Sequence, residues 1–405
     1  MSIFKKVYTC RRASMRFIRY FVFAFPLIAS GCVGPPVLEQ QVLGYDQVTS
    51  ILEQKLLLLN IARVSEEQPV HFTSTSSIAA TFDWTTSIGA GATIAEANDA
   101  NLFNFDFGAS ASENPTFQII PVTGSAFSKQ ILQPFDENIF QFVAFPRSES
   151  LSLVLRMMVG GFQFQNPDGS HSFFVENNPE QPQEYETFRR LVMHLNWLNE
   201  NRNLTIRPLV FEKVIADGMK QAPRAQDIIK GEDTTWTRNS DGTYRMTRFT
   251  AGRLVIANYD LMAMTDNERF MLNEKLKKNP KGQIYVEIRP DGFGGDFPIR
   301  GTLRLRSMYQ ILSFIANDIT GVKEFDVAPD PRTGKANEPN PPETLKIDVS
   351  RSQPALDVTW MRYRDRYYSV ADTPWDRKAF ALLGHLFQTS VGDVENIGIP
   401  ITISK

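Results

Sequence analysis

Residues 82–94 read FDWTTSIGAGATI, and residues 103–111 read FNFDFGASA. In both stretches, mostly apolar residues alternate with small or polar ones. Because successive side chains of a strand point to opposite faces, alternation over this length predicts two long strands. Residues 97–101, ANDAN, have the chemistry of a turn. We therefore expect a long β-hairpin over residues 82–112.

The alternating hairpin allows two interpretations. A strand that crosses a membrane needs about 9–11 residues and one apolar face, and both predicted strands are long enough. One hairpin cannot span a bilayer alone because its edges would stay unpaired, whereas hairpins from several copies could pair edge to edge. The same alternation is typical of an ordinary antiparallel sheet with one buried face, which is the simpler interpretation.

The rest of the chain mixes segments of helical and strand periodicity. Helices are predicted at residues 46–64, 183–199 and 266–278, and after the capping residues Ser307 and Thr373. Strands are predicted at residues 204–211, 243–249, 253–258, 283–289, 345–349, 355–360 and 366–370. This mixture indicates an α+β fold, with antiparallel sheets packed by several short amphipathic helices.

Chain length favours more than one compact region. The chain has 405 residues, which is more than the roughly 250–300 that a single core usually serves. Residues 177–183, NNPEQPQ, are polar and contain two prolines, so we predict a linker there. We expect an N-terminal α+β region at 46–176 and a C-terminal α+β region at 184–405. Residues 328–343 hold five prolines among polar residues and are predicted to form a mobile loop.

The amino terminus has the pattern of an export signal. Residues 1–31 carry six basic residues, no acidic residue and an apolar run at 21–28, as secretory signal peptides do. The tetrapeptide ASGC at 29–32 resembles the bacterial lipoprotein signal, although Ala29 stands where that family prefers Leu, Val or Ile. The resemblance implies cleavage before Cys32, which then carries lipid. The alternative is an ordinary secretory signal with an incidental cysteine.

Cysteine usage agrees with lipidation. Cys10 and Cys32 are the two cysteines of the whole chain. Cys10 is removed with the signal, so the mature chain holds one thiol and cannot form an internal disulfide. A diacylglycerol together with an N-acyl chain exceeds the two-chain requirement for stable anchoring. The sequence GPP at 34–36 predicts a short stiff tether within residues 32–45.

Position 33 and the net charge indicate where the protein lies and what it binds. In enteric-type bacteria an Asp after the lipidated cysteine resembles an inner-membrane retention signal, and this chain has Val33 there. We therefore expect a lipid-anchored protein of the outer membrane that faces the periplasm. Loss of residues 1–31 changes the formal charge from −2 to −8. Such an acidic chain is a poor general binder of nucleic acid. The expected partners are the membrane, through Cys32, and other proteins or further copies of the chain.

Several sequence blocks resemble a set of uncharacterised proteobacterial outer-membrane lipoproteins. They are LLLNIAR at 57–63 with Pro69 and Phe72, ENPTF at 113–117 with PVTGSAF at 121–127, LRSMYQIL at 305–312, and Tyr367-Tyr368 with the helix after it. The blocks span most of the mature chain, but each is short. The resemblance implies an exported, lipid-anchored protein and supplies no catalytic residues.

The sequence offers no motif for catalysis or metal binding. The four histidines, which stand in no metal-ligand spacing, are His71, His171, His194 and His385. Helix packing or surface exposure explains them. The loop DGFGGD at 291–296 could offer carboxylates to calcium, but its spacing is not that of an EF-hand, and a tight turn is the simpler interpretation. We predict no catalytic residue, no cofactor and no metal site, and hence a protein that is not an enzyme.

Two basic clusters are expected to be structural. RYRDRYY at 362–368 interleaves basic and aromatic residues, as surfaces for carbohydrate, phosphate or nucleic acid do. In an acidic chain we instead expect a solvated strand face with cross-strand ion pairs. The lysines at 275–281 lie at the end of a predicted helix, whose dipole they complement.

Two functional hypotheses from different classes remain. The first is a structural or protein-interaction lipoprotein on the periplasmic side of the outer membrane. The alternative is a subunit of an oligomeric outer-membrane pore or export complex that uses the hairpin at 82–112. An enzyme is a third option, because a pair of glycosidase carboxylates needs no local motif.

Overall fold

The computed structural model describes most of the chain. The described residues are 34–93, 102–122, 125–144, 150–166, 168, 170–230, 233–355, 357–392 and 401–404. The predicted signal peptide at 1–31, Cys32 and the predicted turn at 97–101 lie outside them. Helices occur together with mixed and antiparallel sheets, which confirms the predicted α+β class.

The chain divides into two compact units. The first comprises Met1–Gln54, Thr75–Ile119 and Thr402–Lys405, and the second comprises Lys55–Ser74 and Ile120–Ile401. The segment 177–183, for which we predicted a linker, lies inside the second unit, where Pro182 begins a helix. The second unit therefore contains most of both regions expected from the sequence.

A helix begins in the first unit and ends in the second. This helix, α2, runs over Gly34–Ser65. Pro35 and Pro36 lie in its first turn, where the N–H groups that proline lacks have no helical partner in any case. Residues 34–45, which fall within the predicted tether, are therefore helical.

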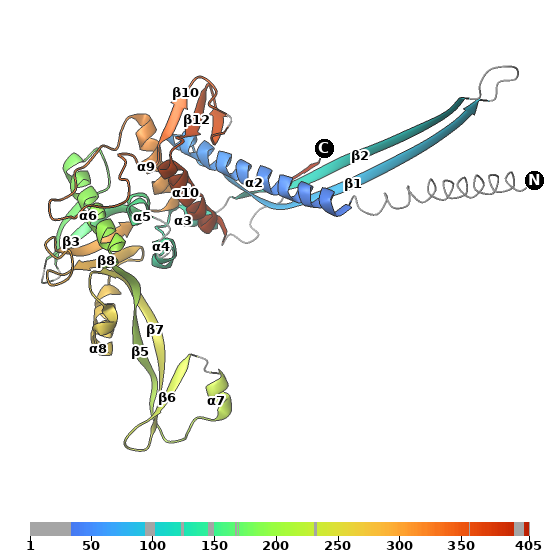
Figure 1. Ribbon diagram of the computed structural model, residues 1–405. Helices are drawn as coiled ribbons and strands as arrows, with labels where there is room; N and C mark the ends of the chain where they lie inside the picture. The colour runs from blue at the N-terminus through green and yellow to red at the C-terminus, as the bar shows by residue number, and fades with distance from the viewer. Residues whose placement is uncertain are drawn as a thin grey trace, which may run out of the picture. The chain divides into compact units, whose positions relative to one another are not determined.

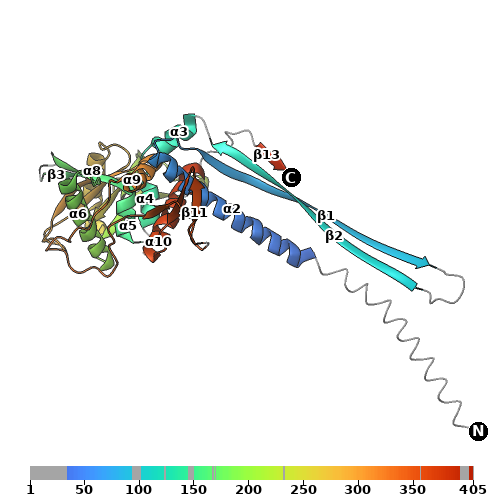
Figure 2. The same cartoon turned by 90° about the horizontal axis from the view of Figure 1, so that it is seen from above.

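Two long strands form a ribbon, most of which belongs to the first unit. They are β1, Phe72–Thr93, with 22 residues, and β2, Leu102–Val122, with 21 residues. The ribbon confirms the hairpin predicted at 82–112 and extends beyond it in both directions. A short strand, β13 (Ile401–Ser404), completes a sheet of order β1-β2-β13, so β1 is an edge strand. Figure 2 shows β1 and β2 as a long twisted ribbon.

The second unit is built on a seven-stranded sheet. Its strands are β3 (Val159–Gln165), β4 (His171–Glu176), β5 (Thr205–Met219), β6 (Thr234–Arg238), β7 (Tyr244–Ala257), β8 (Gln283–Ile288) and β9 (Ile299–Leu305). Their order is β4-β3-β9-β8-β7-β5, and β6 pairs with β7. All pairings are antiparallel except that of β7 with β8. That parallel pair is joined by a crossover connection, which carries a helix.

Helices and a small sheet complete the second unit. The helices are α3 (Ser125–Leu132), α4 (Glu137–Ala144), α5 (Leu151–Met158), α6 (Pro182–Glu200), α7 (Ala225–Lys230), η1 (Leu261–Ala263), α8 (Asp266–Leu276), α9 (Met308–Thr320) and α10 (Pro374–Gly392). The small sheet has the order β10-β12-β11, with β10 at Ile347–Ser350, β11 at Trp360–Tyr363 and β12 at Arg366–Val370.

The main sheet separates two hydrophobic cores. Along β8, Ile284, Val286 and Ile288 lie in the larger core, whereas Tyr285 lies in the smaller one. This split follows from the two-residue period of a strand. Helices α5, α6 and α9 contribute to the larger core, and Leu276 of α8 contributes to the smaller one.

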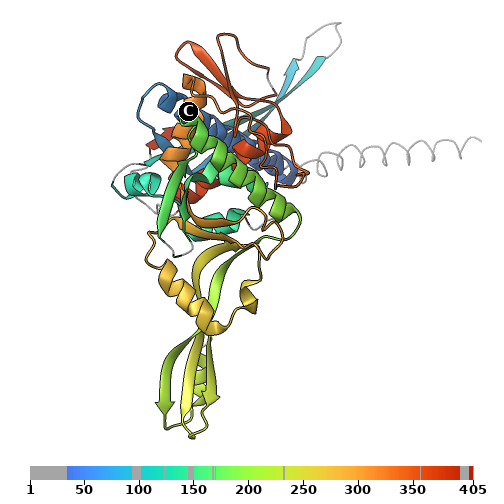
Figure 3. The same cartoon turned by 90° about the vertical axis from the view of Figure 1, so that its left-hand side faces the viewer.

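Strands β5 and β7 extend away from the rest of the main sheet as a long arm. Their pairing runs from Thr205 opposite Ala257 to Met219 opposite Tyr244 and is interrupted by register shifts. Figures 1 and 3 show β6 and α7 at the far end of this arm. Such bulges increase twist and discourage edge-to-edge pairing of exposed strands.

Helix caps agree with the sequence. Thr265 and Glu268 form the predicted capping box of α8, and Ser307 caps α9 as predicted. Gly321 ends α9 with a φ of 107°, a conformation that favours glycine. Among the residues that the structure describes, no helix is both long enough and apolar enough to span a membrane.

Candidate functional site

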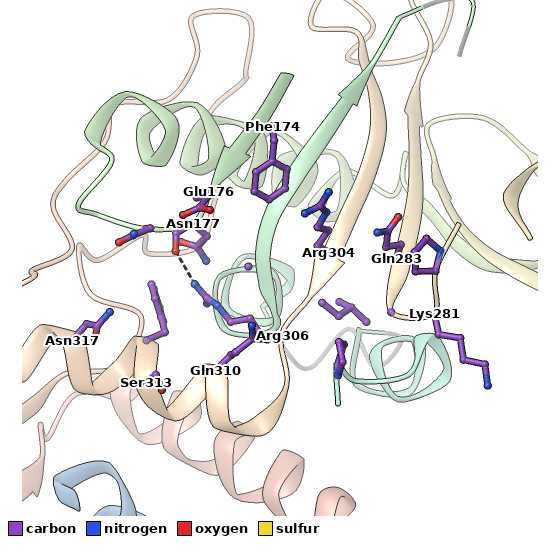
Figure 4. A pocket seen from close by; sticks show the side chains of 17 residues that line it. Phe174, Glu176, Asn177, Lys281, Gln283, Arg304, Arg306, Gln310, Ser313 and Asn317 are labelled. Carbon is purple, nitrogen blue, oxygen red and sulfur yellow. Dashed lines mark hydrogen bonds between the residues drawn. The ribbon is translucent and has the colours of Figure 1, made fainter. Parts of the chain in front are cut away.

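Four strands and a helix form a cleft of about 530 Å³ in the second unit. It lies at the end of the main sheet where β3 and β8 begin and where β4 and β9 end. Figure 4 shows Gln310, Ser313 and Asn317 of α9 on one side, and Arg304 and Gln283 of adjacent strands on the other. Its volume falls within the range of sites for small molecules.

Arg304 brings an exposed guanidinium to the cleft. Its central carbon lies 4.4 Å from the centre of the Phe174 ring. Strand β3 separates β4, which carries Phe174, from β9, so the contact crosses over Gly161 of β3. A side-chain carbon at Gly161 would lie 2.4 Å from the Phe174 ring. Glycine at this position thus lets an aromatic face and a flat cation lie side by side.

Arg306 is a second cation of the cleft, and it is 6% exposed. It donates to the backbone oxygens of Arg156 at 2.9 Å and Asn177 at 2.7 Å, and its guanidinium lies 3.8 Å from the centre of the Phe314 ring. Burial lowers the pKa of Arg306 to about 9. In the described part of the chain no carboxylate lies within ion-pair distance of it, although the charge of Glu324 acts on it from farther away. The charge is therefore held by carbonyl dipoles, an aromatic face and the more distant Glu324.

Asn177 contributes an unpaired acceptor. This buried residue also lines the cleft, and its Nδ2 donates to the backbone oxygens of Arg156 at 2.9 Å and Val159 at 2.8 Å. Its Oδ1 is buried and has no hydrogen-bond partner among the described residues. A buried carbonyl without a donor is unfavourable by about 1–3 kcal/mol, and this oxygen is closed to solvent, so a ligand in the cleft does not reach it without a movement of the side chain.

The lining as a whole is largely polar and on balance cationic. Lys281 adds a third cation to the two arginines, whereas Glu176 is the one acid that lines the cleft. Amide side chains both donate and accept hydrogen bonds, and they come from Asn178, Gln283, Gln310 and Asn317. The site can therefore bind a ligand that combines negative charge with hydroxyl groups.

A network of buried arginines lies next to the cleft on α5 and α6. Arg156 and Arg189 have fully buried side chains, and both face Glu324, at 3.3 and 3.8 Å. The hydroxyl of Tyr185 also donates to Glu324, at 2.8 Å. Burial lowers the pKa of Arg156 to about 10, and burial also raises the pKa of Tyr185. The carboxylate of Glu324 is thus the counter-charge of two guanidiniums.

The proline-rich segment 328–343 is fixed by this network, so the prediction of a mobile loop is wrong. Arg156 donates to the backbone oxygens of Pro341 at 2.8 Å and Pro342 at 2.6 Å. Arg189 donates to Asn340 Oδ1 at 2.8 Å. Proline-rich backbone has few N–H donors but keeps its carbonyls, and buried guanidiniums satisfy those carbonyls here.

The histidines lie at separate places. His194 is buried on α6, with Nδ1 at 3.0 Å from Thr333 Oγ1 and Nε2 at 3.0 Å from the backbone oxygen of Gly294. Burial lowers its pKa. His385 is exposed on α10, and His71 is exposed before β1. The packing of His194 and the exposure of His385 agree with the predictions for these residues.

The glycine-rich loop at 291–296 forms turns that pack on α6. The N–H of Gly295 donates to the backbone oxygen of Gly292 at 3.0 Å. Gly294 has a φ of 73°, and a side-chain carbon there would lie 2.5 Å from Leu198. These contacts confirm the tight-turn interpretation. No group of three potential metal-ligating side chains occurs within the described residues.

The basic and aromatic residues at 362–368 form a hairpin whose cross-strand contacts differ from the prediction. Arg362 lies opposite Tyr367, with its guanidinium 5.8 Å from the tyrosine ring centre. Among the described residues, the ion pair of this segment joins Arg364 of the turn to Glu66 rather than to the facing strand. A cross-strand cation–aromatic contact therefore takes the place of the expected cross-strand ion pairs.

The lysines at 275–281 lie at the C-terminal end of α8 as predicted, and Lys277 pairs with Glu274 at 2.6 Å.

Comparison with known proteins adds no relative. No family model, curated protein or solved structure matches the chain. The resemblance to uncharacterised outer-membrane lipoproteins stays a prediction, as does lipidation at Cys32. The cleft is a feature that the sequence did not predict, because its residues come from elements far apart in the chain.

Proposed function

We propose that this protein is a lipid-anchored envelope protein with a protein-interaction role on the periplasmic side of the outer membrane. The signal pattern at 1–31 and Cys32 supports the anchor, and Val33 supports the outer membrane. The resemblance to proteobacterial lipoproteins belongs to the same proposal. The interaction role rests on the β1–β2 ribbon.

The ribbon carries the proposal because it is long and, within the described residues, has few strands to pair with. Strands of 22 and 21 residues share their sheet with the four residues of β13. A two-stranded ribbon is at best marginally stable in water unless further strands or other elements cover it. The free edge of a long strand also offers N–H and C=O groups to another chain. We infer that the ribbon binds other proteins, including further copies of this chain.

Site-specific photo-crosslinking in cells tests the interaction role. A photoreactive amino acid would replace Thr85 or Asn104 in the ribbon, and Asp241 in the turn before β7 would serve as the control position. We expect adducts of higher mass from the ribbon positions and none from position 241. Absence of adducts from both ribbon positions, or equal adducts from position 241, would contradict the proposal.

Lipid labelling tests the anchor separately. Cells that express the full chain would be fed a labelled fatty acid, and Cys32→Ala would be compared with Cys10→Ala. We expect the label and membrane retention to be lost in Cys32→Ala alone, since Cys10 lies in the predicted signal. A labelled Cys32→Ala protein would rule out anchoring at this residue.

A pore or export subunit is the second candidate function. The observation that favours it is the length of β1 and β2, about twice the 9–11 residues that a membrane-crossing strand needs. The alternation at residues 82–94 and 103–111 adds the required two-faced pattern. Planar-bilayer recording of the full chain would show stepwise conductance, and replacement of 82–112 by a short turn would abolish it. A wild-type protein that produces no conductance would contradict this function.

A further inference from the structure

The lining of the cleft carries more positive than negative charge, with Lys281, Arg304 and Arg306 against Glu176. Arg306 is 6% exposed and donates to backbone oxygens, while the charge of Glu324 acts on it from beyond ion-pair distance. The exposed Arg304 contacts the Phe174 ring and forms no ion pair with a carboxylate of the described chain. An anion in the cleft would therefore be stabilised, chiefly by Arg304.

Negative charge alone does not satisfy the site. Four further amide side chains line the cleft beside the arginines, from Asn178, Gln283, Gln310 and Asn317. Inorganic phosphate is too small to reach amides on both sides of the cleft while it binds an arginine. The amides of Gln283 and Asn317 also match hydroxyl groups, which donate and accept as they do. The ligand therefore needs a carboxylate or similar anion together with several hydroxyls.

Phe174 adds an apolar face to this polar cleft. Its ring is half-buried and lies against the Arg304 guanidinium. A sugar ring has the matching combination of hydroxyls at its edge and C–H groups on its faces. A carboxylate on that ring would receive two parallel hydrogen bonds from the planar fork of Arg304.

We propose that this cleft binds an acidic saccharide, a sugar whose ring carries a carboxylate. Arg304 binds the carboxylate. The amides of Gln283 and Asn317 bind further hydroxyls. The buried guanidinium of Arg306 attracts the carboxylate through its positive charge. This binding site is independent of the ribbon and goes beyond the proposed interaction role.

Binding of matched monosaccharides to the full chain tests the proposal. Glucuronate and glucose differ in having a carboxylate or a hydroxymethyl group on an otherwise identical ring. Ligand-observed NMR titration would measure each with the detergent-solubilised protein, and inorganic phosphate would be added as competitor. We expect glucuronate to bind about tenfold or more tightly than glucose, as the loss of a charged hydrogen bond predicts. We expect phosphate to compete poorly.

Variants identify the site. Arg304→Gln should weaken glucuronate binding about tenfold or more, whereas Arg207→Gln on β5, an exposed cation outside the cleft lining, should leave it unchanged. Phe174→Leu should weaken glucuronate and glucose alike, because it removes the aromatic face that both rings share. Urea unfolding of each variant would show that the fold is retained.

Three results would overturn the proposal. They are equal binding of glucose and glucuronate, equal effects of Arg304→Gln and Arg207→Gln, and displacement of glucuronate by equimolar phosphate. Failure of the wild-type protein to bind either sugar would overturn it as well. None of these results bears on the ribbon, so the proposed interaction role is tested separately.

Discussion

Buried arginines hold together segments of the second unit that are distant in sequence. Arg156 on α5 and Arg189 on α6 both reach Glu324 and the carbonyls of the proline-rich segment 328–343. Arg306 joins the end of β9 to the backbone of α5 and to Asn177. Each guanidinium offers five donors in a fixed plane, so one side chain can satisfy several carbonyls at once. The fold at these points depends on charged side chains as much as on apolar packing.

Loss of the charge on Glu324 should destabilise the second unit strongly. Glu324→Gln leaves Arg156 and Arg189 buried without a counter-charge, which predicts a loss of about 3–5 kcal/mol in the free energy of unfolding. Glu186→Gln is the matched control, since Glu186 pairs with Arg190 at the surface and should change stability by about 1 kcal/mol or less. Urea unfolding measures both, and similar losses in the two variants would contradict this role of the network.

The buried His194 should make stability depend on pH. Burial lowers the pKa of His194 below its ordinary value of 6.5, so the unfolded chain binds this proton more readily than the folded chain. The stabilisation of the folded chain by neutral, buried His194 is therefore fully present above about pH 6.5 and is lost as the pH falls below that value. His194→Gln should reduce the difference in unfolding free energy between about pH 7.5 and about pH 5. The exposed His385→Gln should preserve that difference, and equal pH dependence in both variants would refute the assignment.

Some structural features could be predicted from neighbouring residues in the sequence, whereas others depend on contacts between residues far apart in the chain. The capping residues Thr265 and Ser307 were identifiable because a capping box acts within four residues. The segment 328–343 could not be assigned, because its prolines indicate a loop and its partners lie on α5 and α6. The helical start of α2 was also missed, because a GPP sequence suits both a tether and a first helical turn.

The candidate site was hidden for the same reason. Its cations come from β9 and the residues before β8, whereas Phe174 and Asn177 come from β4 and its end. One local signal was present: Arg304 and Arg306 alternate with Leu303 and Leu305 and thus share a strand face. Nothing in the local sequence shows that Asn177 Oδ1 lacks a donor or that Phe174 crosses Gly161.

Two glycines allow the strand packing at the cleft to be tested as an element. Gly161→Ala on β3 would place a carbon 2.4 Å from the Phe174 ring and 2.6 Å from a backbone oxygen, so we expect a loss of about 1–3 kcal/mol. Gly384→Ala on α10 meets nothing within 4 Å and should instead stabilise the protein by about 0.5–1 kcal/mol, because alanine suits a helix interior. Thermal unfolding distinguishes the two variants by the sign of the change. A neutral Gly161→Ala would show that Phe174 can move aside freely.

At the scale of the whole molecule, three features suggest three tasks for separate parts of the chain. The predicted lipid anchor at Cys32 would hold the protein at the membrane, the β1–β2 ribbon would bind other proteins, and the cleft of the second unit would bind an acidic sugar. The formal charge is −2 for the whole chain and would be −8 after removal of the predicted signal, so the cationic lining of the cleft is a local exception rather than part of a basic surface. The parts can thus be tested one at a time by variants that leave the others intact.

The mass of the complex extracted from native membranes tests the central claim about the ribbon most directly. Light scattering in mild detergent would compare the full chain with a variant in which residues 82–112 are replaced by an Asn-Gly turn, which suits a two-residue hairpin. We predict that the full chain elutes in a complex heavier than one copy and that the variant elutes as a single chain that still unfolds cooperatively. A single chain in both samples, or a heavy complex of unchanged mass in the variant, would contradict the role of the ribbon in assembly.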